Sequence, residues 1–466
     1  MKILIATVEL APVASAGGVA QYTMGLARAL REAGHDVHVA IPDYRFLPDF
    51  VPSILEGITV HRVGRHHHFQ NVRDARGIYG TGGDFEPWVT FARAVTELVR
   101  TSRPDIVHCQ DAHTSLVPVF IAAERQQNSA AFPQTRSVIT IHNLLEQGKG
   151  GRDFFDRLSL PQALFDTHFE FFGQTNCFKA GLLMADRVST VSRTYANEIP
   201  TSDEFGFGLA GVLRALPVTP AGIVNGIDAE SWKLAGARYD GTDDIEAITQ
   251  TKRSLLPTLL PIWSQEQEVP VIAFKARWDR QKGILLLAEC MEEVLEHARF
   301  IFDTWPEPRD GHADHFDVWK VLTSLRDRYP LRFALNVPRT TSPEESVALY
   351  TAADFLIMPS VYEPCGLAQM ECQRFGCIPI VRRTGGLADT VTDLTAGVSK
   401  ANGIVFDTMT RAGLMTAVKR AVTAHSDSRV MKSLLANALG QDNEWNTRME
   451  AYESLYESAK RVEPGG

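Results

Sequence analysis

Short apolar runs alternate with stretches of helical spacing along most of the chain. Residues 20–33 illustrate the helical type, because apolar side chains recur there every three or four positions up to Gly34. The runs of the first half that we predict to be buried strands are residues 2–8, 36–41, 105–108, 137–141, 187–191 and 222–224. Those of the second half are residues 269–275, 298–303, 331–335, 355–358, 378–381 and 403–406. Strands that alternate with helices in this way are typical of parallel α/β sheets.

The alternation is interrupted between about residues 233 and 268, where polar residues and prolines dominate. A chain of 466 residues is also too long for a single hydrophobic core. A Gly-Gly turn opens a predicted helix in each half, at residues 17–18 and again at residues 385–386. We therefore predict two doubly wound, Rossmann-like α/β domains that face a cleft, residues 1–240 and residues 265–440. The aromatic-studded tail, residues 441–466, is predicted to be helical.

The composition narrows the classes of function. With 44% hydrophobic and 22% charged residues, the chain is an ordinary globular protein. Its net charge of −9 argues against nucleic acid or an anionic membrane as the main partner. Six cysteines without a CxxC pair, a first strand that starts at residue 2 and the lack of an apolar run of about 20 residues predict a reduced, cytoplasmic protein.

Two predicted strands of the second half end in residues that suit a phosphorylated sugar. One strand is followed by Glu363 and Gly366, and the other by Thr384 and Gly385. Ligands of parallel α/β sheets bind at the carboxyl ends of strands, next to helix N-termini whose free N–H groups favour anions. We therefore predict that these two turns bind a polyol attached to a phosphate.

A second acid, Glu371, follows Glu363 after eight residues. On a helix this spacing is slightly more than two turns, so we predict that the two acids lie roughly on one face. One acid would then meet sugar hydroxyls and the other a ribose. The alternative for Glu371 is a solvated acid on the surface of a helix.

Arg277 and Lys282 lie at the end of the first predicted strand of the second half. An always-charged guanidinium and a mobile ammonium can converge on a diphosphate from this position. Together they would neutralise the charge that grows on a leaving nucleotide. The alternative is that both are solvated surface cations.

Polar residues also follow two consecutive strands of the first half. Asp111, His113 and His142 resemble a metal triad by residue type. Metal sites usually need short, regular ligand spacing, however, and no nearby residue completes one. We therefore predict no metal here, and instead a hydrogen-bonding floor for a sugar that includes Asn143. For His113 the alternative is a core histidine with satisfied hydrogen bonds.

Longer motifs resemble those of glycogen and starch synthases, a family of retaining GT-B glycosyltransferases. These motifs are Glu-Pro-Cys-Gly-Leu at residues 363–367, the pattern of Arg277, Gln281, Lys282 and Gly283, and the runs 178–192, 205–214 and 222–228 followed by Trp232. The resemblance covers most of the chain and implies the GT-B arrangement, with the helix of residues 441–466 crossing back to the first domain. It implies a nucleotide-sugar donor as co-substrate, no other cofactor, and an α-glucan acceptor.

The resemblance also implies roles for individual residues. The catalytic set would be His142, Arg277, Lys282 and Glu363. The donor would be held by Gly17, Gly18, Asn225, Cys365, Gly366, Leu367, Glu371, Thr384 and Gly385, and the substrate cleft lined by Asp111, His113 and Asn143. Backbone N–H groups at residues 365–367 would hold sugar hydroxyls and phosphate. The alternative for Asn225 is an asparagine in a left-handed turn before a glycine.

The chain departs from the family pattern at three places on the nucleotide side. The family signature Lys-x-Gly-Gly-Leu-Ala-Asp reads Ser-Ala-Gly-Gly-Val-Ala-Gln at residues 15–21, without the lysine or the acid. Residues 303–308 replace a glycine-rich turn, and residues 337–341 replace a loop with an aromatic nucleobase contact. The main prediction is glucosyl transfer from an NDP-glucose to an α-1,4-glucan. The departures leave open a transferase for a small acceptor, such as a sugar phosphate, cyclitol or natural product, or a catalytically silent glucan-binding relative.

Overall fold

The computed structural model describes residues 1–47, 54–81, 84–127, 135–228, 245–263, 269–305, 313–335 and 343–462. The chain divides into unit 1, which comprises Met1–Ile227 and Glu444–Gly466, and unit 2, which is Asp228–Asn443. The interruption in the sequence pattern is therefore not a linker throughout. It contains helix α11 (Ile245–Leu259), which packs against helix α14 (Pro343–Ala352) of unit 2. Trp232 and residues 306–308 and 337–341 lie outside the described residues.

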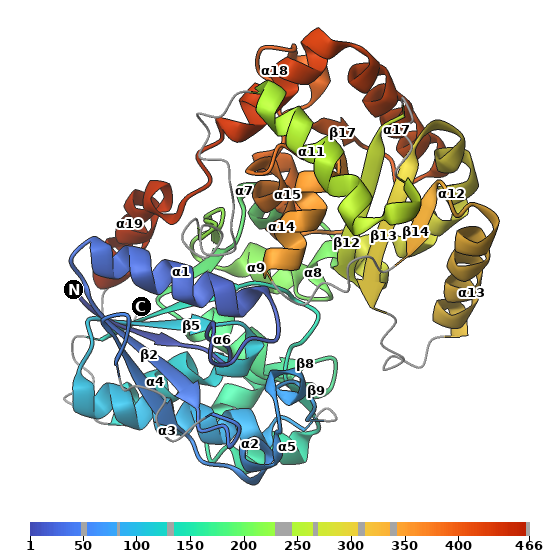
Figure 1. Ribbon diagram of the computed structural model, residues 1–466. Helices are drawn as coiled ribbons and strands as arrows, with labels where there is room; N and C mark the ends of the chain where they lie inside the picture. Colours follow the sequence, from blue (N-terminus) through green and yellow to red (C-terminus); the bar gives the residue numbers. More distant parts are fainter. Residues whose placement is uncertain are drawn as a thin grey trace. The chain divides into compact units, whose positions relative to one another are not determined.

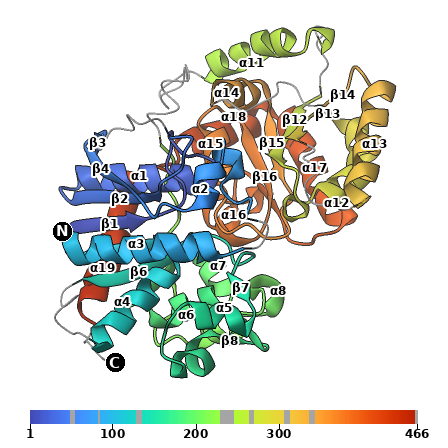
Figure 2. The same ribbon diagram turned by 90° about the horizontal axis from the view of Figure 1, so that it is seen from below.

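Unit 1 is built on a sheet of eight strands in the order β11-β10-β6-β5-β1-β2-β4-β3. All neighbouring strands are parallel except β3 and β4. Helix α1 (Gly18–Glu32) covers one face, and helices α3 (Glu86–Ser102) and α4 (Leu116–Gln127) cover the other (Figures 1 and 2). The strands are β1 Lys2–Ala6, β2 Asp36–Pro42, β3 Ile54–Leu55, β4 Ile58–Val63, β5 Ile106–Gln110, β6 Arg136–Ile141, β10 Arg187–Thr190 and β11 Ala221–Gly222.

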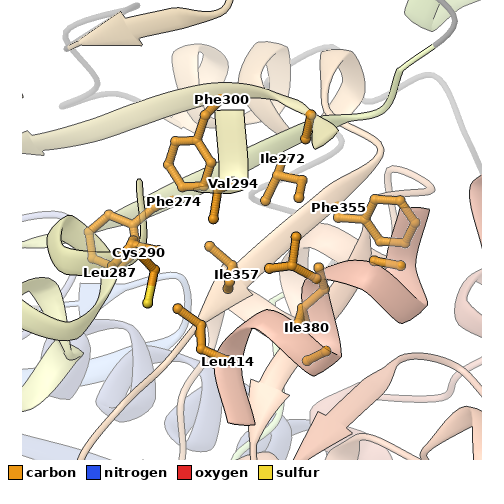
Figure 3. Packing of buried hydrophobic residues seen from close by; sticks show 14 of the residues in the cluster. Ile272, Phe274, Leu287, Cys290, Val294, Phe300, Phe355, Ile357, Ile380 and Leu414 are labelled. Atoms are coloured by element: carbon orange, nitrogen blue, oxygen red, sulfur yellow. The ribbon is translucent and has the colours of Figure 1, made fainter. Parts of the chain in front are cut away.

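Unit 2 is built on a fully parallel sheet of six strands in the order β14-β13-β12-β15-β16-β17. Its strands are β12 Val271–Arg277, β13 Arg299–Trp305, β14 Phe333–Leu335, β15 Phe355–Met358, β16 Ile378–Arg382 and β17 Ile404–Phe406. Both faces are buried, because alternate side chains of each strand enter different hydrophobic clusters. Figure 3 shows one of these clusters, where Ile272, Phe300 and Ile380 of the strands meet Leu287 and Leu414 of the covering helices. The prediction of two doubly wound α/β units is confirmed.

A small antiparallel sheet in unit 1 was not predicted. It consists of β7 (Lys149–Gly150), β9 (Gln174–Asn176) and β8 (Glu170–Phe171). Strands of two or three residues leave no alternation to detect, so the apolar pattern contains no signal for them. Strand β4 was also missed, because Thr59, His61 and Arg62 interrupt its apolar residues.

The C-terminal segment packs on unit 1 through aromatic side chains. Trp445 lies so close to Gly25 of α1 that a Cβ added there would come 1.9 Å from the indole Nε1. In helix α19 (Met449–Lys460), the Tyr456 hydroxyl lies 2.9 Å from Nδ1 of the buried His108 on β5. The tail is therefore part of the fold of unit 1.

Replacing Trp445 with alanine should lower the free energy of unfolding by about 3–5 kcal/mol, because a large buried ring is lost from a tight contact. Denaturant unfolding of the wild type and the variant measures the difference. Phe172→Ala is the control, since that ring is 84% exposed and its loss should change stability little. A Trp445→Ala protein as stable as the wild type would contradict the packing described.

Candidate active site

The position of Lys282 is fixed by the turn after β12, whose backbone is capped at one end and tightly packed at the other. Asp279 caps the 3-10 turn η5 (Arg280–Lys282) by accepting from the N–H of Gln281 at 2.9 Å. Gly283 follows with φ of +72°, and a Cβ at this position would lie 1.9 Å from the carbonyl oxygen of Pro359. Only glycine fits both the left-handed backbone and this close approach. The sequence Gln-Lys-Gly therefore holds the lysine against the loop that follows β15.

Lys282 and Glu363 form a nearly buried ion pair. Lys282 Nζ lies 2.7 Å from Glu363 Oε2, and the two side chains are 20% and 6% exposed. The Ser360 hydroxyl donates to the same carboxylate oxygen at 3.0 Å. Removing a carboxylate from water is unfavourable unless it is paired and hydrogen-bonded, and both conditions are met here. The structure therefore brings together the cation and the acid that the sequence placed at the ends of two strands.

A second glycine turn supports the backbone of Glu363 from the next strand. Gly385, at the start of helix α16 (Gly385–Thr390), has φ of +44°, and a Cβ there would lie 1.8 Å from the Glu363 carbonyl oxygen. Gly386 donates its N–H to the same oxygen at 3.0 Å. Thr384 is buried at the N-cap of this helix. The Gly-Gly pair is thus required by contact between the two turns, apart from any ligand.

The residues after Glu363 leave backbone N–H groups available. The Gln369 amide nitrogen donates to the carbonyl oxygens of Cys365 and Gly366, at 3.1 and 2.9 Å. Among the described residues, nothing accepts a hydrogen bond from the N–H groups of Gly366 or Leu367. Gly366 has φ of +71°, a left-handed conformation that cannot be part of a regular α-helix. Two free N–H donors therefore lie within four residues of Glu363 along the chain.

Glu371 does not share a helix face with Glu363, and that prediction is wrong. Helix α15 begins at Ala368, because the left-handed Gly366 interrupts the backbone between the two acids. Glu371 is buried and accepts from the Tyr350 hydroxyl at 3.3 Å. Burial raises the pKa of Glu371, while the nearby Lys275 ammonium and the Tyr350 hydroxyl oppose that rise. The solvated-acid alternative is therefore also wrong.

Arg277 lies at the end of β12 with its side chain 75% exposed. Its ion pair with Asp279 is loose, at 4.0 Å. The structure gives no contact between Arg277 and either Lys282 or Glu363. The guanidinium thus remains free to move toward a ligand from the same strand end.

In unit 1, Asp111 holds the backbone at the end of β6. Its Oδ1 accepts from the N–H groups of His142 and Asn143, at 2.7 and 3.2 Å. Asp111 also has φ of +59°, an unusual conformation for a residue with a side chain. Burial raises the pKa of Asp111 to about 7, although the two backbone hydrogen bonds oppose the rise. Burial lowers the pKa of His142 to about 3, so that ring is neutral at pH 7.

Replacing Asp111 with asparagine should make stability less dependent on pH. The pKa of Asp111 in the folded protein lies above the ordinary value of an aspartate, about 3.9, so its contribution to stability is complete below about pH 4 and is lost as pH rises through about 7. Between pH 5 and pH 8 the wild type should therefore lose about 2.7 kcal/mol in free energy of unfolding that Asp111→Asn keeps. Denaturant unfolding at both pH values measures this, with Asp317→Asn, whose side chain is 76% exposed, as the control. An equal difference at both pH values would contradict the assignment.

His113 lies among aromatic rings rather than in a hydrogen-bonded core. Its ring centroid is 4.8 Å from that of Trp88 and 5.1 Å from that of Tyr79. The described residues offer its ring no hydrogen bond, so the alternative of a satisfied core histidine is not supported. Burial lowers the pKa of His113 to about 4. Asn143 accepts from the Leu145 N–H at 2.9 Å.

Asn225 is almost completely buried, and its Oδ1 has no hydrogen-bond partner. Asn225 is absent from the left-handed residues of the described chain, so the turn alternative is wrong. Gly226 instead provides space, because a Cβ there would lie 2.6 Å from Trp445 Cα. Among the described residues, the buried Asn225 Oδ1 therefore remains an unused hydrogen-bond acceptor.

Glu9 is a residue that the sequence analysis missed. It is 1% exposed and accepts from the N–H groups of Ala16 and Gly17 and from the Tyr79 hydroxyl. It therefore fixes the turn that starts α1, where Gly17 and Gly18 are themselves exposed. The sequence contained one signal for Glu9, namely that it is a single acid between an apolar strand and a glycine turn.

Two further findings concern metals and membranes. No group of three or more His, Cys, Asp and Glu side chains that could hold a metal ion occurs in the described parts of the chain. Asp111, His113 and His142 do not form such a group. None of the described helices combines the length and the apolar character needed to cross a bilayer.

Two Rossmann-like units in one chain are the architecture of GT-B glycosyltransferases, and the similarity of the chain to known proteins places it in that class. The family models "Starch synthase catalytic domain" and "Glycosyl transferases group 1" match residues 2–215 and residues 317–432. Glycogen synthase of Koribacter versatilis (strain Ellin345) is 33% identical and covers 99% of each chain, and that of Geotalea uraniireducens (strain Rf4) is 31% identical and covers 98% of this chain and 99% of its own. The solved catalytic domain of starch synthase IV from Arabidopsis thaliana, bound to ADP and acarbose, covers 99% of both chains with a TM-score of 0.83 and 26% identity. The chain belongs to the glycogen and starch synthase family.

Proposed function

We propose that this glycosyltransferase moves a glucosyl unit from a nucleoside diphosphate glucose to an α-1,4-glucan, with retention at the anomeric carbon. The observation that carries the proposal is the Lys282–Glu363 ion pair, followed along the chain by the free N–H groups of Gly366 and Leu367. Lysine and amide donors suit a diphosphate, and a fixed carboxylate suits sugar hydroxyls. Two curated relatives that match over nearly their full length are glycogen synthases, which supports the choice of reaction.

Each residue then has a proposed role. Lys282 and the exposed Arg277 neutralise the charge on the departing diphosphate, so the step needs no metal. Glu363 and the amides of residues 365–367 hold the transferred glucose, Glu371 holds the ribose, and Thr384, Gly385, Gly17 and Gly18 form backbone contacts with the donor. In unit 1, His142, Asp111, His113, Asn143 and Asn225 contact the sugar and the acceptor.

The proposed step is front-face attack within a short-lived ion pair. The acceptor hydroxyl attacks the anomeric carbon on the side that the diphosphate leaves, and the departing phosphate oxygen takes the hydroxyl proton. None of the proposed residues is assigned as a covalent nucleophile. We also propose that the reaction takes place in the cytoplasm, where the six free, buried cysteines remain reduced.

A second candidate is transfer to a small acceptor, favoured by the loss of the signature lysine and acid at residues 15–21. A panel of ADP-, UDP- and GDP-glucose tested with glycogen, maltooligosaccharides and small acceptors separates the two. The proposal expects nucleoside diphosphate release and chain extension by glucosyl units. Transfer only to a small molecule would replace the glucan assignment, and glycogen binding without transfer from any donor would indicate a silent relative.

A further inference from the structure

Gln110 and His142 form a hydrogen bond whose direction is set by chemistry. Gln110 is the last residue of β5 and is 1% exposed, and its Oε1 lies 2.8 Å from Nε2 of His142. An amide oxygen can only accept a hydrogen bond, so Nε2 of the imidazole must carry the proton. The neighbouring strand therefore selects one of the two tautomers of His142.

The other ring nitrogen is left as an acceptor. Burial keeps the imidazole neutral at pH 7, so a proton on Nε2 leaves Nδ1 with a free lone pair. The described residues give Nδ1 no hydrogen-bond partner, and His142 is not completely buried. The Tyr22 ring packs edge-on against the imidazole of His142, with the two ring centroids 4.4 Å apart, and this contact opposes rotation of the imidazole.

Stability alone does not explain a glutamine at position 110. Its Nε2 is buried without a hydrogen-bond partner, which destabilises a folded protein. A leucine of similar size would avoid that orphan donor. Gln110 therefore provides the hydrogen bond to His142 although its unpaired Nε2 lowers the stability of the fold.

We propose that Gln110 is a positioning residue for glucosyl transfer: it locks His142 in the Nε2–H tautomer, so that Nδ1 accepts a hydrogen bond from a hydroxyl of the bound sugar. This inference rests on the proposed function, because it assumes that His142 contacts a sugar. It adds a residue outside the family motifs and a defined protonation state to that proposal.

Kinetics of Gln110→Leu test the role directly. The variant frees the tautomer of His142, so kcat should fall by about tenfold, the loss of one hydrogen bond to the reacting sugar. Its unfolding temperature should stay equal to or above that of the wild type, because the orphan donor is gone. A merely structural role would instead lower the unfolding temperature and leave kcat unchanged, which would overturn the inference.

A second variant, Gln110→Glu, tests the same role through the pH dependence of transfer activity. The carboxylate accepts the same Nε2 proton and raises the pKa of His142, so activity should fall toward low pH more steeply than in the wild type. The other groups that face His142 are Asp111, whose pKa is about 7, His108, whose pKa is about 3, and the Tyr22 ring. These are common to both proteins, so the ratio of variant to wild-type activity isolates position 110. Gln126→Glu, on the exposed end of α4, is the charge-matched control and should leave the profile unchanged.

Nitrogen-15 NMR of histidine-labelled protein observes the tautomer without any substrate. The His142 signals, assigned by their loss in His142→Gln, should show a protonated Nε2 and a bare Nδ1 in the wild type and a mixture in Gln110→Leu. A wild-type Nδ1–H tautomer would overturn the inference whatever the activity. A wild-type protein with the expected tautomer but no transfer from any donor would instead defeat the proposed function.

Discussion

Lys282→Ala should lower kcat for glucosyl transfer by about two to three powers of ten. The ammonium is the cation nearest the Glu363 carboxylate, at 2.7 Å, and stabilisation of a developing negative charge by a fixed donor is typically worth this much. The variant should also be less stable, because it leaves Glu363 as an unpaired carboxylate at 6% exposure. Steady-state kinetics with saturating donor and thermal unfolding measure the two effects.

A double variant separates these effects. Lys282→Ala combined with Glu363→Gln removes the uncompensated charge, so it should recover most of the stability lost in Lys282→Ala. Its activity should remain as low as that of the single variant, because both groups act on the donor. Lys320→Ala is the matched control, since that lysine is 77% exposed on helix α13 (Ala313–Arg328). Recovery of activity together with stability would show that the pair is only structural.

Gly385→Ala should reduce transfer at least a hundredfold and destabilise unit 2. The new Cβ would be placed 1.8 Å from the carbonyl oxygen of Glu363, so the loop that carries the acid must move. Displacement of a reacting group by about an ångström is enough for a loss of this size.

Gly397→Ala is a matched control for the backbone strain. Gly397 also has a positive φ, +104°, but nothing lies within 4 Å of the position of its Cβ. It therefore tests the conformational penalty alone, about 1 kcal/mol or more, and should leave kcat unchanged. Equal losses of activity in the two variants would contradict the link between the Gly385 turn and Glu363.

The parallel strands were predictable because both faces of each sheet are buried. A strand such as Ile378–Arg382 then appears as a short, continuous apolar run, and the predicted and observed bounds differ by one residue. Helix α11 was missed because Pro257 and polar residues obscure its spacing, although its packing on α14 makes it helical. Packing between segments outweighs local propensity there.

The candidate site was predictable where function depends on local turns. Lys282, Gly283, Glu363 and Gly385 each lie in the turn that follows a strand, so sequence position determines where they lie. Glu371 was oriented wrongly, because one left-handed residue, Gly366, resets the helix phase. Gln110 was missed for a different reason. It meets His142 only through the register of β5 and β6, and single-sequence patterns do not contain register.

The most direct test is a crystal structure of the protein with a nucleoside diphosphate and glucose bound. The account predicts a phosphate oxygen within hydrogen-bond distance of Lys282 Nζ and of the N–H groups of Gly366 and Leu367, with a glucose hydroxyl on Glu363. A nucleotide bound elsewhere, with the Lys282–Glu363 pair unchanged at 2.7 Å, would contradict it.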